Sequence, residues 1–217
     1  MATTPAHRLR RALASASALG LCLALLACWL RRPAAEPPPA PPPVPAPVPA
    51  PPPPPCTAIE RIEVSKSQRT LRAHCRAGAV VEMTAALGRE PEGDKRDAGD
   101  WRTPEGLYRV SGRPRESRFH LFIPIDYPSV EDAEQALYEG RISLATYRLI
   151  AAAHAEGRPP PAHTALGGGL GFHGEGERWR GDSVDLDWTE GCVALRDADV
   201  DFIAERIEVG TPVEIRP

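Results

Sequence analysis

A proline-rich segment separates the part of this chain that can fold from a part that cannot. Fifteen of the 26 prolines lie within residues 33–55, where Glu36 is the only charged residue. Proline lacks a backbone N–H and fixes φ, so such a run favours extended polyproline II and builds no core. We expect residues 33–55 to be a spacer, which at about 3.1 Å per residue reaches on the order of 70 Å. A docking site for a proline-binding module is the alternative interpretation.

The N-terminus resembles an export or anchoring signal. Arginines within residues 8–11 precede an uncharged, mostly apolar run over residues 12–30, and two more arginines close it. This pattern is typical of a signal peptide or a single membrane anchor. Residues 25–28 (Leu-Leu-Ala-Cys) resemble a bacterial lipobox, in which Cys28 would carry the lipid. A lipoprotein, an uncleaved anchor and a cleaved soluble form stay open for residues 1–32. In each case the rest of the chain lies in the periplasm or cell envelope, and the first two tether it to the membrane.

Residues 56–217 are long enough to fold as one domain. They carry 21 basic and 28 acidic side chains, so this part of the chain is acidic. Such a domain without a basic patch binds nucleic acid poorly, because neutralisation of phosphates dominates that affinity. DNA and RNA are therefore not expected as partners. No P-loop, G-x-G-x-x-G or paired Cys-x-x-Cys motif is present, and no cofactor is expected.

Strand patterns predominate in this domain. Helical patterns are confined to a pair of runs within residues 129–156, opened by Ser129 and Ser143, and to residues 197–208. Alternating or β-favouring runs occupy residues 59–64, 69–74, 79–85, 106–111, 119–125 and 211–215. The sequence therefore predicts a mainly β domain with a small helical insertion near residues 129–156.

Three cysteines, Cys56, Cys75 and Cys192, fall in the part of the chain expected outside the cytoplasm. Two of three can pair in an oxidising compartment. Cys56 and Cys75 flank two strand-like runs that could form a hairpin, so we predict a disulfide between them. This pairing leaves Cys192 as a free thiol, which calls for a chemical reason.

Cys192 and His173 are the candidates for that chemistry. They lie 19 residues apart, in Gly-Phe-His-Gly (171–174) and Thr-Glu-Gly-Cys (189–192). A cysteine nucleophile needs a base, usually histidine, and backbone donors for the oxyanion. Taken alone, a single cysteine is more often a small buried apolar residue and a single histidine more often has a structural role, so the spacing by itself favours structural roles for both. A zinc site is the rival chemistry, but the spacing matches no zinc signature, so no metal is expected.

The residues around this pair resemble the YkuD-type L,D-transpeptidases, whose signature is a histidine followed by glycine, a variable loop and then Ser/Thr-x-Gly-Cys. The similarity runs from about residue 59 to residue 217. The other matching stretches are Ala86-Leu87-Gly88, Gly93-Asp94-Lys95, Thr103-Pro104-Glu105-Gly106, Ser117-Arg118-Phe119-His120-Leu121 with Tyr127-Pro128, and Thr164-Ala165-Leu166-Gly167-Gly168. The resemblance implies a curled mixed β-sheet or sandwich.

It also implies a mechanism in which Cys192 is the nucleophile and His173 the general base. Family members attack the diaminopimelate carbonyl of a peptidoglycan stem tetrapeptide, release D-alanine and hold a thioester until an amine resolves it. The amides of Gly191 and Cys192 are the candidates for the oxyanion hole. Further candidates for contact with the substrate or the oxyanion are Thr189, Gly174, Arg196 and His120.

Two departures from the family pattern concern the substrate. Many members have His where this chain has Glu190, and Arg, thought to meet a substrate carboxylate, where it has Ala194. Arg196 stands two positions further on. The acceptor and the choice between transfer and hydrolysis therefore stay open, as does the oligomeric state. The alternatives are a same-family amidase or hydrolase acting on peptidoglycan or a wall-linked lipoprotein, and a catalytically silent wall-binding module.

Overall fold

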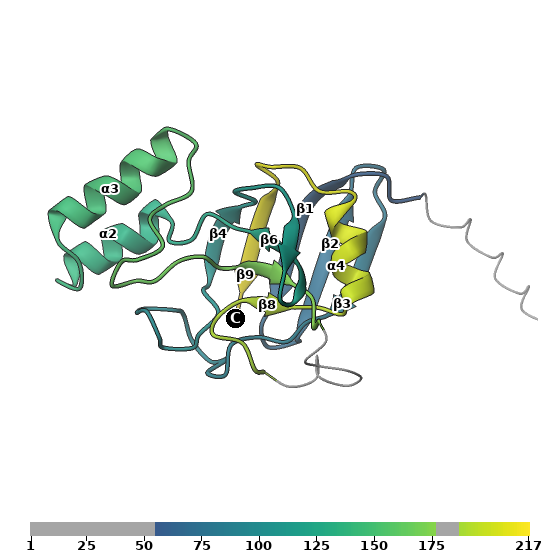
Figure 1. The fold of residues 1–217 in the computed structure, drawn as a ribbon, viewed down its shortest axis with the longest axis horizontal. Coiled ribbons are helices and arrows are strands. Elements are labelled where there is room, and N and C mark those ends of the chain that lie inside the picture. The colour runs from purple at the N-terminus through teal and green to yellow at the C-terminus, as the bar shows by residue number, and fades with distance from the viewer. Residues whose placement is uncertain (1–54, 177–186) are drawn as a thin grey trace, which may run out of the picture. The chain divides into compact units, whose positions relative to one another are not determined.

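Two β-sheets form the framework of the domain (Figure 1). This computed structural model describes residues 55–176 and 187–217. The expected signal or anchor segment (1–32) and nearly all of the expected spacer (33–55) lie outside these residues, so both stay predictions. Among the residues described, none of the helices combines the length and hydrophobicity needed to cross a membrane.

The first sheet has five strands in the order β3-β2-β1-β9-β4. Strands β1, β2 and β3 pair antiparallel in chain order, whereas β9 inserts parallel to β1 and antiparallel to β4. In β1, Ile62 and Val64 are buried and Arg61 is exposed, so one face of the sheet covers the core. The bounds are β1 (Ile59–Ser65), β2 (Thr70–Cys75), β3 (Val80–Thr84), β4 (Gly106–Arg109) and β9 (Pro212–Arg216).

The second sheet has four strands in the order β5-β6-β7-β8. Strand β7 runs antiparallel to β6 and parallel to β8, and all three of its residues are buried. The sequence patterns did not predict β7 or β8, because strands of three and two residues are too short for a periodic signal. The bounds are β5 (Arg115–Ser117), β6 (His120–Pro124), β7 (Gly171–His173) and β8 (Val193–Ala194).

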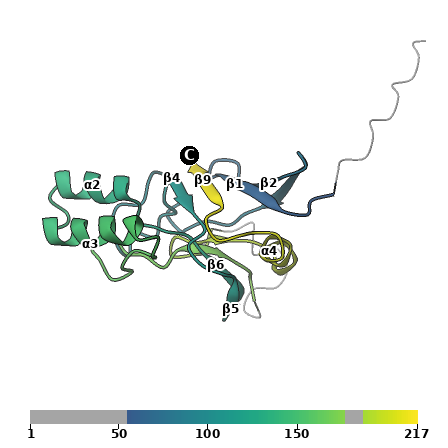
Figure 2. The ribbon, with the colours of Figure 1, turned by 90° about the horizontal axis from the view of Figure 1, so that it is seen from above.

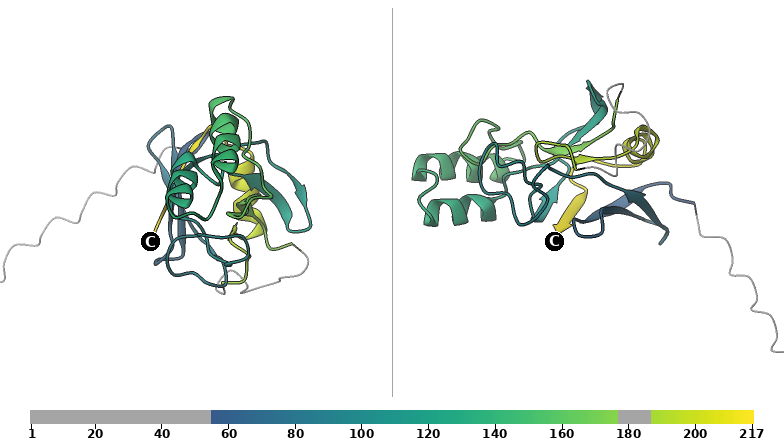
Figure 3. Two further views of the ribbon diagram at one scale, coloured as in Figure 1. Left: turned by 90° about the vertical axis from the view of Figure 1, so that its left-hand side faces the viewer. Right: turned by 90° about the horizontal axis from the view of Figure 1, so that it is seen from below.

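The described residues form three α-helices: α2 (Val130–Tyr138), α3 (Leu144–Ala155) and α4 (Asp197–Ala204). The first two begin after the predicted caps Ser129 and Ser143, which confirms the helical insertion. They pack against each other to one side of the sheets, and α4 lies at the opposite side (Figures 1 and 2). Figure 3 shows the α2–α3 pair projecting from the sheets.

One hydrophobic cluster joins both sheets and α4. It contains Ile62 of β1, Ile123 of β6, Phe172 of β7 and Ile203 of α4. The apolar spacing predicted a helix up to residue 208, but α4 ends at Ala204. Ile207, which continues the spacing, is buried from the segment that connects α4 to β9. Mixed sheets sharing one core agree with the fold expected from the sequence.

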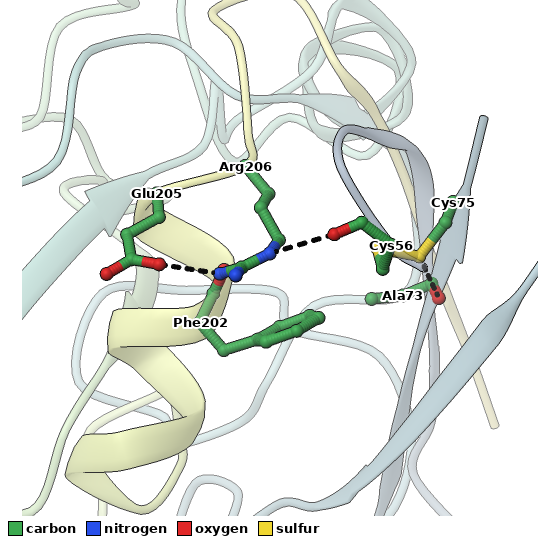
Figure 4. The surroundings of a disulfide bond; sticks show 6 residues. All are labelled: Cys56, Ala73, Cys75, Phe202, Glu205 and Arg206. Carbon is green, nitrogen blue, oxygen red and sulfur yellow. Dashed lines mark hydrogen bonds and ion pairs between the residues drawn. A yellow bond between two sulfur atoms is a disulfide. The ribbon is translucent and has the colours of Figure 1, made fainter. Parts of the chain in front are cut away.

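The predicted disulfide between Cys56 and Cys75 is confirmed, with 5.3 Å between the two Cα atoms (Figure 4). Cys75 ends β2, and the expected antiparallel pairing of β1 with β2 is also present. Arg206 fastens the same corner, because its Nε donates to the Cys56 carbonyl at 3.0 Å. Its guanidinium also lies over the ring of Phe202 in α4, 4.2 Å from the centroid. The start of the described chain is thus held to the body of the domain.

Candidate active site

Cys192 and His173 come from neighbouring parallel strands. His173 ends β7 and pairs with Ala194 of β8, while Phe172 pairs with Val193. Side chains alternate along a strand, so in this register Cys192, directly before β8, belongs to the same sheet face as His173. Both residues line one cavity of about 480 Å³, named here the Cys–His cavity. The structure therefore brings the two predicted catalytic residues together.

His173 is held in a defined tautomer. Its side chain is buried, and its Nδ1–H donates to the Gly174 carbonyl at 2.7 Å, which leaves Nε2 as the acceptor nitrogen. The ring stacks on Phe119 with 4.8 Å between centroids and meets Trp188 edge-on at 5.4 Å. Burial lowers the pKa of His173, the charge of Arg118 lowers it further, and the bond to Gly174 opposes both. The imidazole is therefore neutral at neutral pH and able to accept a proton.

The loop after His173 is fixed by Asp197, the first residue of α4. Its Oδ1 accepts from the backbone N–H groups of Glu175 at 2.8 Å and Gly176 at 3.1 Å. A Cβ at position 174 would lie 2.2 Å from the same oxygen, so a larger residue there would have to displace this carboxylate. Gly174 supplies the carbonyl that orients the His173 ring, and its expected contact with the substrate or the oxyanion stays a prediction.

Cys192 is an unpaired, partly exposed cysteine packed against the core. Burial raises the pKa of its thiol to about 11; a backbone hydrogen bond with Gly171 and the charge of Lys95 oppose this shift, and Glu190 adds to it. The resting residue is therefore a neutral thiol at neutral pH. To act as a nucleophile it must transfer its proton to a base, and His173 lines the same cavity.

Thr189 shapes the turn that carries Cys192. Its hydroxyl donates to the Cys192 carbonyl at 2.7 Å and accepts from the Gly191 N–H at 3.0 Å. The Gly191 N–H is thereby used inside the turn, whereas the Cys192 N–H meets no acceptor within the described residues. Gly191 has φ +128°, and a Cβ there would lie 2.7 Å from the Arg102 carbonyl. Of the two amides expected for the oxyanion hole, that of Cys192 is the available one in this geometry.

The segment before the turn is anchored to Arg69, directly before β2, and to the loop that follows β3. Asp187 pairs with Arg69 at 2.7 Å and accepts from the Leu87 N–H at 2.9 Å. The N–H of Thr189 donates to the Leu87 carbonyl and the N–H of Arg89 to the Thr189 carbonyl, both at 3.1 Å. The Ala-Leu-Gly stretch recognised in the sequence therefore backs the cysteine turn.

The Thr-Pro-Glu-Gly stretch (103–106) supports the same region. The Thr103 hydroxyl oxygen accepts from the Gly88 N–H at 2.9 Å. Lys66, almost fully buried, donates to the Thr103 carbonyl at 2.9 Å and pairs with Glu105 at 2.7 Å. This buried charge is fully engaged, which identifies the motif as structural support.

Two further candidates lie away from the Cys–His cavity. His120, in a left-handed conformation with φ 67°, donates through Nε2 to Asp201 of α4 at 2.7 Å. Arg196 is exposed and occupies the position before α4, where its side chain makes no capping hydrogen bond. Neither residue lines the cavity. The bond to Asp201 holds the His120 ring at α4. Ala194, which stands where many family members have Arg, is fully buried.

The cavity also holds residues for which the sequence suggested no role. Arg118, Phe119 and Phe122 come from the β5–β6 hairpin, and Arg89 follows the Ala-Leu-Gly stretch. The hairpin lies far from the signature in sequence, so only the pairing of β6 with β7 shows that it forms a wall. Within residues 55–176 and 187–217, no three His, Cys, Asp or Glu side chains are grouped as a metal site.

Comparison with known proteins bears on the identity of the domain. Residues 59–215 match the YkuD family model, described as the L,D-transpeptidase catalytic domain, which confirms the resemblance found in the sequence. A search of curated proteins gives no significant match.

Several solved structures resemble the chain. Bd1075 of Bdellovibrio bacteriovorus is 24% identical over 73% of this chain and 48% of its own, with a TM-score of 0.42. An L,D-transpeptidase of Xylanimonas cellulosilytica is 16% identical over 76% and 64% of the two chains, with a TM-score of 0.38. L,D-transpeptidase 3 of Mycobacterium tuberculosis is 15% identical over 72% and 59%, with a TM-score of 0.43. The chain thus spans about half to two-thirds of these proteins.

Proposed function

The chain belongs to the YkuD family of L,D-transpeptidase catalytic domains, and from this premise we propose that it is a cysteine-dependent peptidoglycan L,D-transpeptidase. One observation carries the proposal. The unpaired thiol of Cys192 lines the same cavity as His173, whose Nδ1 is committed to the Gly174 carbonyl and whose Nε2 is left to accept a proton. This is the arrangement that an activated cysteine nucleophile requires.

In the first half-reaction, Cys192 Sγ attacks the carbonyl that joins diaminopimelate to D-alanine in a stem tetrapeptide, and its proton passes to His173 Nε2. The Gly174 carbonyl, which accepts the Nδ1–H, stabilises the imidazolium that forms. The Cys192 N–H is the candidate donor to the developing oxyanion. Collapse breaks the C–N bond, and D-alanine leaves as an amine with the proton from His173. A thioester on Cys192 remains.

In the second half-reaction, an amine of a second stem peptide attacks the thioester. His173 Nε2 takes the proton of the amine and returns one to the departing Cys192 sulfur. A new amide bond forms and the thiol is restored, so neither oxidant nor metal enters the balance. A thioester suits this sequence because it persists long enough to meet an amine and still reacts readily with it.

Location is a separate part of the proposal and rests on sequence alone. The arginine-flanked apolar run within residues 1–32 and the spacer of residues 33–55 suggest a domain held in the periplasm or cell envelope by a lipid or an anchor. That location would place the Cys–His cavity beside its peptidoglycan substrate.

The test measures D-alanine release from a donor tetrapeptide by the full chain, with and without an added stem peptide. A transpeptidase releases D-alanine faster when the acceptor amine is present and forms the cross-linked product. A hydrolase releases it equally fast without acceptor. A folded protein that binds the peptide but releases no more D-alanine than its Cys192→Ala variant would contradict the proposal and favour the wall-binding module.

A further inference from the structure

The Cys–His cavity holds two guanidinium groups although the domain is acidic. Arg89 and Arg118 both line it, together with the acids Asp187 and Glu190. Asp187 is already neutralised by Arg69, whose Nη2 lies 2.7 Å from its Oδ2. Glu190 is then the one acid of the lining without such a partner among the described residues, so positive charge is in excess.

The two arginines are held differently. Arg89 donates from Nε to the Trp188 carbonyl at 3.3 Å, and its guanidinium lies 5.2 Å from the centroid of Trp101. The Arg118 guanidinium lies 4.6 Å from the centroid of Phe119, and Phe119 stacks on His173. A guanidinium, an aromatic ring and the base are thus layered along one wall of the cavity.

Among the described residues, only the face of the Arg118 guanidinium is engaged, by the ring of Phe119. Stacking uses the face of the guanidinium, whereas its N–H donors lie in the plane and match a carboxylate as a two-pronged fork. Arg118 forms no ion pair within the described part of the chain. The charge of Arg118 also opposes protonation of His173, and a bound carboxylate would offset that effect as the base takes up its proton.

We propose that Arg118 binds a carboxylate of the acyl donor and so selects donors that carry one beside the scissile bond. The inference rests on the proposed function and adds a specificity-determining residue to it. Arg196, two positions beyond Ala194, does not line the cavity and leaves this role to the β5–β6 hairpin.

A stem tetrapeptide offers two such carboxylates. One is the terminal group of the leaving D-alanine, and the other lies on the side chain of the diaminopimelate residue. Peptides amidated at either group keep the scissile bond and remove one negative charge, so they distinguish the two sources.

The experiment measures peptide binding by calorimetry in the Cys192→Ala full chain, which cannot form a thioester. Adding Arg118→Gln should weaken binding of the unmodified tetrapeptide about 10- to 100-fold, the range for a hydrogen bond to a charged group. To the Cys192→Ala parent chain, one of the two amidated peptides should bind as weakly as the unmodified tetrapeptide binds to the Arg118→Gln variant. Adding Arg118→Gln should not change the affinity for that amidated peptide.

Arg115→Gln is the matched control. Arg115 lies on the same hairpin with its guanidinium 4.8 Å from the centroid of Phe122, but it does not line the cavity. It should bind every peptide like the parent, and circular dichroism should show both variants folded. Equal binding by the Arg118→Gln variant, or equal weakening for all peptides, would overturn the proposal. Failure of the proposed function would appear separately, as a wild-type chain that binds the tetrapeptide without releasing D-alanine.

Discussion

The two sheets of this domain differ in the state of their cysteines. In the five-stranded sheet, Cys75 at the end of β2 is bonded to Cys56, and this disulfide links the two ends of the β1–β2 hairpin. In the four-stranded sheet, Cys192 stands unpaired before β8, in a cavity with a neutral histidine. Cys75 is buried and Cys192 is partly buried, so burial alone does not distinguish the bonded cysteine from the free one. The difference lies in what surrounds the sulfur: a second thiol in one case, an oriented base in the other.

The first prediction concerns His173, the base that shares the cavity with Cys192. His173→Gln should slow acylation of Cys192 by donor tetrapeptide about 10²- to 10⁴-fold, as loss of a general base does. Rapid-quench mass spectrometry measures the rate. In the wild type, the lowered pKa of His173 keeps the base neutral above pH 6.5, so the rate should fall only as pH drops below that value. A His173→Gln variant that acylates at the wild-type rate would show that His173 does not act as the base for Cys192.

The second prediction concerns the disulfide between Cys56 and Cys75. The disulfide closes a loop of about 20 residues, so the Cys56→Ser, Cys75→Ser double variant should lose about 3 kcal/mol of unfolding free energy. Urea denaturation measures this loss. Acylation at 25 °C should stay near the wild-type rate in the folded fraction, because the bond lies in the other sheet. A parallel loss of acylation in fully folded protein would show that the two regions are coupled.

The third prediction sharpens the contrast at Cys192 itself. With its pKa raised from 9.0 to about 11, the thiol should hold about 100-fold less thiolate at neutral pH than an unperturbed cysteine. The alkylation rate by iodoacetamide, followed on the Cys192 peptide without substrate, should keep rising until about pH 11. A plateau already at neutral pH would instead indicate a resting ion pair with His173.

The fourth prediction concerns how the base is held. Asp197→Ala removes the acceptor of two backbone N–H groups in the loop whose first carbonyl fixes the His173 tautomer. We expect acylation about tenfold slower, since a misoriented base loses part of its effect, and a mixture of His173 tautomers by ¹⁵N NMR. Asp197→Asn, which keeps an acceptor oxygen, should preserve both.

Asp199→Ala is the control for that variant, because Asp199 also lies in the first turn of α4 and contributes to helix stability. It should change neither the rate nor the tautomer. If Asp197→Ala behaved like Asp199→Ala, the carboxylate would be a helix-stabilising group without influence on the base.

Local signals predicted the parts of the fold that depend on local chemistry. Ser129 and Ser143 begin the two helices as expected, because a capping side chain acts within its own turn. The short strands β7 and β8 were not predicted, since their conformation depends on pairing with distant residues.

The candidate site divides in the same way. The signature identified Cys192 and His173, but Arg118 was not assigned a role, because nothing in its neighbourhood shows which cavity the hairpin borders. His120 was one candidate for substrate contact, and the structure places its ring against Asp201 of α4, outside the cavity. These outcomes depend on tertiary contacts that one sequence does not encode in any short pattern.

The central claim is that Cys192 becomes acylated while Cys56 and Cys75 stay bonded to each other. Intact-protein mass spectrometry of the full chain with donor tetrapeptide, followed by peptide mapping without reduction, tests it most directly. We expect a mass increase equal to the donor minus D-alanine, located on the Cys192 peptide and removed by an added amine, with the Cys56–Cys75 peptide unchanged. No adduct in a folded protein with a reduced Cys192, or an adduct on another residue, would contradict the account.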